Sequence, residues 1–236
     1  MKILAIDSSS MVASVAIADE KITIAEYTIN SKKTHSQTLL PMIEDMFEKS
    51  EIPKSEIDYI AVAGGPGSFT GLRIGCATAK GLGLAWDKPL VKIPTMDAIA
   101  YGVFGVEGVV CSMMDARREQ VYAGLYRFVD NEMQTIMEQK PVEVRELIEQ
   151  LNAMGEKVTF AGDGIEVYES IIKEAVTTDY VFAPTHTNRN RAAALAALAV
   201  KYIEKNKVIS AAELVPDYLR VSQAERERNE KIKSQA

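Results

Sequence analysis

A glycine-rich run between a strand pattern and a helix pattern is the strongest constraint on how this chain can fold. Residues 58–63 (DYIAVA) are apolar enough for a short buried strand, and residues 72–86 are small or apolar at helical spacing. The run between them, residues 64–71 (GGPGSFTG), therefore has to turn from strand into helix. Glycine permits such a turn because it tolerates φ > 0 and lets another segment approach closely. We accordingly expect an α/β protein in which this turn joins a sheet to a helix.

The same turn is a candidate nucleotide or anion site. Ser68 and Thr70 can cap the new helix, and the helix start beside Gly65 and Gly67 offers free N–H groups and a partial positive charge. The run has neither the lysine of a P-loop nor the third glycine of the dinucleotide fingerprint. A turn that only packs the helix on the sheet is the alternative, and the spacing favours this simpler interpretation.

Asp7 is the second candidate for a nucleotide site. It follows the strand pattern at residues 3–6 and precedes Ser8, Ser9 and Ser10. Ligands of a bound metal–phosphate group are often placed at such a strand end. A carboxylate that only caps the serine turn is the alternative.

The order of the elements indicates two similar halves. Each half begins with strands joined too closely for crossover helices, as in an antiparallel meander, and then alternates helices with strands. The meander strands are expected at 3–6, 12–17 and 22–29, and at 109–114, 120–128 and 133–138. We therefore predict lobes at residues 1–103 and 104–187. A helix at 190–205, capped by Asn188 or Asn190, is a candidate to return to the first lobe.

The composition excludes several classes of function. A net charge of −6 argues against a protein that binds nucleic acid without the help of a partner. His35 and His186 have no metal-ligand spacing, and Cys76 and Cys111 form no Cys-x-x-Cys motif, so we expect no metal and no cofactor. No apolar run is long enough to span a membrane, and an acidic residue comes too early for a signal peptide, so we expect a soluble, cytoplasmic protein. Residues 222–236 are dense in charge and are expected to form a flexible tail.

Two helices carry more small and apolar surface than one domain needs. Helix 36–49 has a wide apolar stripe, and helix 70–86 has small residues at every fourth position. The candidate interface residues are Leu39, Met42, Ile43, Met46, Gly71, Leu72, Gly75 and Ala79. We expect them to contact a partner subunit or a second copy of the chain, with packing inside the same domain as the alternative.

Five segments resemble, in the same order, the TsaB family, which is also called YeaZ. They are Ile6–Ser9, His35–Ser36 with Leu39–Pro41, Gly65–Gly75, Met114–Arg118 with Val121–Tyr122, and Pro216–Arg220. The resemblance covers nearly the whole chain and implies an actin-like, hsp70-like, sugar-kinase-like (ASKHA) fold of two similar lobes. It also implies a subunit of the bacterial machinery that places threonylcarbamoyl on the adenosine beside the anticodon of certain tRNAs. The implied partners are a TsaD-like catalytic subunit, a TsaE-like ATPase and, for the chain alone, a second copy in a homodimer; tRNA would be contacted only indirectly.

The resemblance further implies that this chain is not the catalyst. TsaD binds its catalytic metal through a histidine pair on the helix after the strand that follows the glycine turn. The matching residues here, 94–100 (PTMDAIA), contain no histidine. We therefore expect a non-catalytic scaffold. The rivals are a phosphotransferase of the same fold, in which Asp7 holds Mg²⁺ and the glycine turn holds phosphate, and a metallopeptidase, which the missing ligands weaken.

Overall fold

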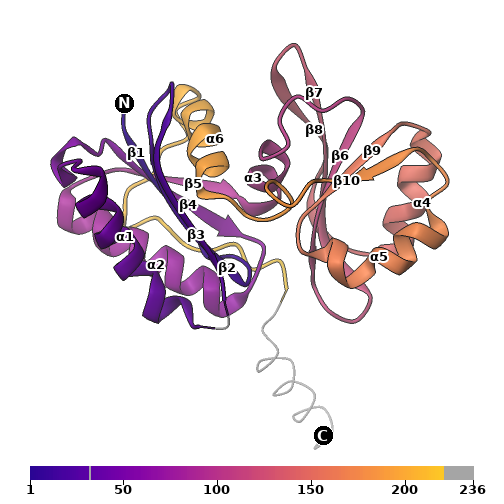
Figure 1. The fold of residues 1–236 in the computed structure, drawn as a ribbon, viewed down its shortest axis with the longest axis horizontal. Coiled ribbons are helices and arrows are strands. Elements are labelled where there is room, and N and C mark those ends of the chain that lie inside the picture. The colour runs from indigo at the N-terminus through magenta and orange to yellow at the C-terminus, as the bar shows by residue number, and fades with distance from the viewer. Residues whose placement is uncertain (32, 221–236) are drawn as a thin grey trace, which may run out of the picture.

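The computed structural model describes residues 1–31 and 33–220, so the predicted tail at 222–236 lies outside the described residues. Two five-stranded sheets stand side by side, each flanked by helices (Figure 1). The first lobe contains β1 (Ile3–Asp7), β2 (Val12–Ala18), β3 (Thr23–Asn30), α1 (His35–Ser50), the 3₁₀ helix η1 (Lys54–Glu56), β4 (Tyr59–Gly65), α2 (Phe69–Trp86), β5 (Leu90–Pro94) and α3 (Thr95–Tyr101). The second contains β6 (Val109–Asp115), β7 (Gln120–Val129), β8 (Glu132–Glu143), α4 (Val144–Met154), β9 (Val158–Ala161), α5 (Gly164–Ala175) and β10 (Tyr180–Phe182), and α6 (Ala192–Glu204) follows.

The two sheets have the same topology. The first has the order β3-β2-β1-β4-β5. The second has the order β10-β9-β6-β7-β8, which from its opposite edge is β8-β7-β6-β9-β10, so β6 takes the place of β1. In each lobe the first strand pairs antiparallel with the second and parallel with the fourth. The predicted antiparallel meanders are therefore present in both halves. This duplicated pattern confirms the predicted ASKHA fold of two similar lobes.

Alternation along β1 explains how the first sheet is covered on both faces. Leu4 and Ile6 point to one face, where they pack in a core with residues of α1 and α2. Ile3 and Ala5 point to the other face, where they pack with α6. Because both faces of the strand are buried, β1 consists of apolar residues until it reaches Asp7.

The lobes meet through α3 and the central strands of the second sheet. On one face of that sheet, α4 and α5 cover a separate apolar core. On the other face, Met96 and Ile99 of α3 pack in one cluster with Val110, Met114 and Tyr126. Between β1 and α6 the polypeptide crosses between the lobes twice, at residues 102–108 and again just before α6.

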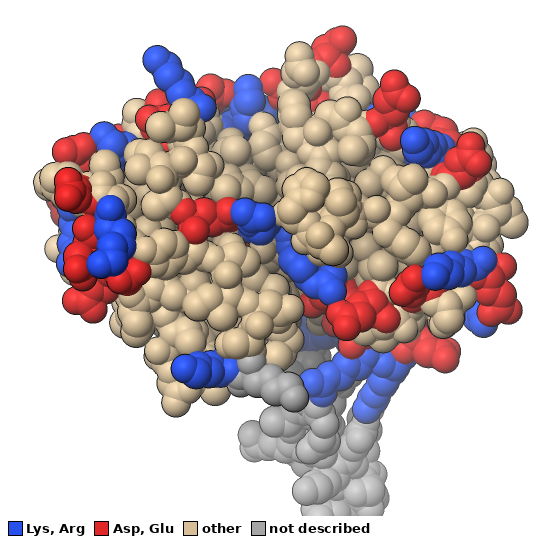
Figure 2. All heavy atoms as spheres, in the orientation of Figure 1, with Lys and Arg blue, Asp and Glu red and all other residues tan. Residues whose placement is uncertain are grey.

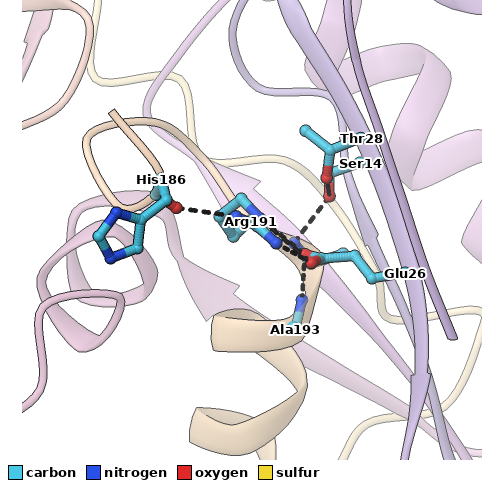
Figure 3. A network of polar contacts seen from close by, with 7 residues as sticks. Ser14, Glu26, Thr28, His186, Arg191 and Ala193 are labelled. Carbon is cyan, nitrogen blue, oxygen red and sulfur yellow. Dashed lines mark hydrogen bonds and ion pairs between the residues drawn. The ribbon is translucent and has the colours of Figure 1, made fainter. Parts of the chain in front are cut away.

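The start of α6 differs from the prediction, because neither Asn188 nor Asn190 caps the helix. The N-cap position is Arg191, which makes no side-chain cap hydrogen bond. The first N–H groups instead donate across the lobe, Ala192 N to Ser14 Oγ at 2.9 Å and Ala193 N to Glu26 Oε1 at 3.0 Å (Figure 3).

The Glu26 carboxylate is positioned for this role by Arg191. The Arg191 guanidinium pairs with Glu26 and also donates to the His186 carbonyl oxygen at 2.8 Å. A carboxylate at a helix N-terminus compensates both the free N–H groups and the helix dipole. The caps were missed because they come from strands 178 and 167 residues away, where no local sequence pattern could indicate them.

Candidate functional site

The glycine run forms the predicted turn from strand to helix. β4 ends at Gly65, which has a φ of 118°, and α2 begins at Phe69. Ser68 is the N-cap, and its Oγ accepts a hydrogen bond from Gly71 N at 3.2 Å. Ser68 therefore has the predicted capping role, whereas Thr70 lies exposed on the first turn of the helix.

The serine turn between β1 and β2 packs directly on the glycine turn. Ser68 N donates to the Ser9 carbonyl oxygen at 2.7 Å, and Ser8 Oγ donates to the Gly71 carbonyl oxygen at 2.9 Å. A Cβ atom at Gly67 would overlap the Ser9 carbonyl oxygen, and one at Gly71 would overlap that of Ser8. Two donors at this helix start, Ser68 N and Gly71 N, and the space beside Gly67 and Gly71 are thus occupied by the chain itself.

Asp7 is fully buried beside the same two turns. Its Oδ1 accepts hydrogen bonds from Ser9 N at 2.9 Å and Ser9 Oγ at 2.6 Å, and its Oδ2 accepts one from Asn190 Nδ2 at 3.1 Å. Burial raises the pKa of the Asp7 carboxyl above its usual value, and the hydrogen bonds from Ser9 and Asn190 oppose that shift. The geometry is that of a carboxylate that fixes a turn, the alternative role considered for this residue. Among residues 1–31 and 33–220, no cluster of three or more His, Cys, Asp or Glu side chains could hold a metal ion.

Helix α3 lies where the resemblance places catalytic metal ligands, and it is packed on all sides. Asp97 is almost fully buried and accepts hydrogen bonds from Tyr126 Oη at 2.7 Å and Tyr202 Oη at 2.9 Å. Burial raises the pKa of this carboxyl. The N–H of Met96 donates to Gln139 Oε1 at 3.2 Å, and Gln139 Nε2 donates to the Gly65 carbonyl oxygen at 3.0 Å. Sequence reasoning missed Gln139 and assigned Asn190 to a helix cap instead, because each acts on residues far away in the chain.

The second lobe has a counterpart of the glycine turn between β9 and α5. Burial raises the pKa of Asp163, at the N-cap of α5, to about 6, while Arg189 partly opposes this. Asp163 Oδ1 accepts a hydrogen bond from Asp115 N at 3.3 Å. The sequence carried no signal for the shifted pKa of this carboxyl.

The candidate interface residues are buried in the chain's own core, so their assignment to a surface is corrected. Leu39, Met42, Ile43, Met46, Leu72 and Ala79 are each at most 6% exposed. Gly71 and Gly75 are also buried, and a Cβ at Gly75 would overlap Ser8 Oγ. An apolar stripe looks the same in a sequence whether a sheet or a partner covers it, and here the sheet covers it.

A different face of α2 is open to solvent. It is formed by Arg73, Ala77, Gly81 and Leu84, and Leu84 is 67% exposed. At the start of the helix, Phe69 stacks on Tyr218 with ring centroids 4.4 Å apart. An added Cβ at Gly81 would meet no atom within 4 Å, so the chain's own packing does not require glycine there.

The fold and the closed turn define a class, a duplicated α/β protein of the ASKHA type whose glycine turn is packed by its own chain. A family model described as "TsaD: tRNA N6-adenosine threonylcarbamoyltransferase" matches residues 23–228. A tRNA threonylcarbamoyladenosine biosynthesis protein TsaB from Bacillus subtilis is 30% identical over 95% of this chain and 96% of its own. The Escherichia coli TsaB is 33% identical over 74% of this chain and 77% of its own.

Solved structures agree with the sequence relatives. YeaZ from Pseudomonas aeruginosa matches with a TM-score of 0.79 and 26% identity, covering 92% of this chain and 99% of that one. The chain therefore belongs to the TsaB (YeaZ) family of tRNA threonylcarbamoyladenosine biosynthesis proteins, and the predicted resemblance is confirmed. No helix in the described part of the chain is both long and apolar enough to cross a membrane.

Proposed function

We propose that this chain is a non-catalytic, cytoplasmic subunit that supports a TsaD-like enzyme in placing threonylcarbamoyl on tRNA adenosine. The observation that carries the proposal is the closed site, because the glycine turn is hydrogen-bonded to the serine turn that contains Ser9. Asp7 uses both carboxylate oxygens within the chain, which argues against the rival phosphotransferase role for it. Pairing with a TsaE-like ATPase belongs to the same proposal.

The exposed face of α2 is the surface that we assign to the partner. Glycine inside a helix costs roughly 0.5–1 kcal/mol relative to alanine. Gly81 carries that cost although an added Cβ would meet no atom within 4 Å, and Ala77 lies one turn before it on the same exposed face. Small residues let the backbone of another helix come close, while Leu84 and Phe69 offer apolar contacts at the two ends. Because the family model named for TsaD matches this chain, a TsaD-like partner would share its fold. In the absence of that partner, the same face would pair with a second copy.

The test uses two identical substitutions on exposed helix positions. Ala77→Leu adds bulk to the exposed face of α2, whereas Ala153→Leu adds the same bulk to an exposed position of α4 in the other lobe. We expect Ala77→Leu to melt like the wild type but to lose capture by the purified TsaD-like subunit of the same organism. Threonylcarbamoylation of tRNA in the reconstituted system should fall with it, while Ala153→Leu keeps both.

Two outcomes would each contradict one part of the proposal. If the TsaD-like subunit still captures Ala77→Leu as it captures the wild type, the assignment of this surface is wrong, but the supporting role is not contradicted. ATP hydrolysis by the isolated wild-type chain, absent in an Asp7→Asn variant that is still folded, would favour the phosphotransferase instead.

A further inference from the structure

The junction between the lobes is tied at several separate places, and each tie comes from a different segment. Figure 2 shows one face of this junction, where acidic and basic side chains form a row across the middle of the molecule. The arrangement bears on whether the lobes can move, because two lobes joined by short linkers open easily only when few interactions cross between them.

Gln139 is the central tie. It projects from β8 of the second lobe, and both ends of its amide reach the first lobe, to the Gly65 carbonyl oxygen at 3.0 Å and to Met96 N at 3.2 Å. One side chain thus provides hydrogen-bond partners for a backbone group at the end of β4 and for another at the beginning of α3. If the lobes separated, a donor and an acceptor would lose their partners in a half-buried place.

The second tie is the last part of the described chain, residues 215–220, which we call the strap. Figure 1 shows the chain after α6 running across the first lobe toward the second. Asp217 N donates to the Gly64 carbonyl oxygen at 2.7 Å, and the Asp217 carboxylate pairs with Lys92 at 2.8 Å. Arg220 then reaches the β6–β7 hairpin of the second lobe, where its Nη1 donates to the Ala116 carbonyl oxygen at 2.6 Å.

The second linker, just before α6, is fastened to both lobes by neighbouring residues. Arg189 donates to the Gly162 carbonyl oxygen at 3.4 Å and pairs with Glu166 at 2.7 Å, both in the second lobe. Asn190 binds Asp7 and Ser9 of the first lobe. A linker held on either side of a single peptide bond has little freedom to act as a hinge.

We infer that Gln139 and the strap clasp the two lobes into one rigid body, so that the junction does not open in solution. A rigid body of this kind presents the same surface to a partner with or without nucleotide, because nucleotide does not close the lobes. The inference does not depend on the proposed function, because it concerns only the motion of the lobes.

The experiment measures the distance between the lobes in the full chain. Spin labels are placed at Gln37→Cys on α1 and Glu149→Cys on α4, both exposed, while the native Cys76 and Cys111 are buried and protected from labelling. With the labelled chain diluted in excess unlabelled chain, so that distances between two copies do not contribute, double electron–electron resonance should give one narrow distance, unchanged by millimolar Mg-ATP. Two distances, or a shift on adding Mg-ATP, would overturn the inference without any further variant.

A second measurement assigns the clasp to its residues. In the labelled chain, Gln139→Ala combined with Arg220→Ala should broaden the distance distribution, and amide exchange at residues 64–68 and 94–98 should become roughly three- to tenfold faster. Gln134→Ala is the matched control, because Gln134 is exposed on the same strand. Circular dichroism establishes that the double variant is folded. A folded double variant with the narrow wild-type distance and wild-type exchange would show that these side chains do not clasp the lobes.

Discussion

Two glycines on the same helix should respond in opposite ways to alanine. Gly75 and Gly81 both lie inside α2, where replacing glycine by alanine gains roughly 0.5–1 kcal/mol of helix stability. An added Cβ at Gly81 meets nothing, so Gly81→Ala should raise the melting temperature by about 2 °C. At Gly75 the added Cβ overlaps Ser8 Oγ, and overpacking of this kind costs about 1–3 kcal/mol. The net effect should be a loss of about 1 kcal/mol and a melting temperature lower by about 2–4 °C.

Removing Ser8 Oγ tests whether that overlap is the cause. Ser8→Ala alone should cost about 0.5–1.5 kcal/mol, because the Gly71 carbonyl oxygen loses a buried hydrogen bond of 2.9 Å. In the Ser8→Ala background the next atom lies 3.7 Å from the new Cβ, an ordinary contact, so Gly75→Ala should become stabilising. Thermal unfolding of the four proteins in this double-mutant cycle measures the coupling. The reasoning is refuted if Gly75→Ala raises the melting temperature of the wild-type background as much as Gly81→Ala does.

Two further predictions follow from the caps of α2 and α5. Ser68→Ala should cost about 1 kcal/mol in urea unfolding because α2 loses its cap, whereas Thr70→Ala, which removes an exposed hydroxyl, should cost much less; equal losses would argue against the cap. Burial raises the folded pKa of Asp163 to about 6, above the usual value of 3.8. Between these two pH values the folded state holds more protons than the unfolded state, so this carboxyl lowers stability as the pH rises. Asp163→Asn should therefore gain stability relative to the wild type between pH 4 and 6, and exposed Asp179→Asn should not; a difference that is flat with pH would disprove the role of Asp163.

Local patterns were sufficient for the elements whose partners lie close in the sequence. The strand and helix around the glycine turn have short-range signatures, and Ser68 is a cap that can be recognised from its place before an apolar helix. The antiparallel meander follows from connections too short for helices. The duplicated topology then follows from the repeated order of elements, although no sequence repeat is visible.

Long-range polar partners could not be found in the same way. Nothing near Asn190 in the sequence indicates that it binds Asp7, which lies 183 residues away. The burial of Met46 and Ala79 was also ambiguous, because a broad stripe fits a sheet, a neighbouring helix or a partner equally well. In the structure α1 and α2 cover one face of the sheet together, which accounts for the width of the stripe without any partner.

The first lobe is completed by α6, the last helix among the described residues, and this order matters while the protein is being synthesised. Ile3 and Ala5 leave the ribosome first, but Leu195 and Ala199, which cover them, leave it only after the whole second lobe. Domains tend to fold as they emerge, and an uncovered apolar face is prone to wrong association. Here one face of the first sheet stays uncovered until nearly the entire chain has been synthesised. A nascent chain that pauses within the second lobe therefore presents a bare sheet face to chaperones and proteases.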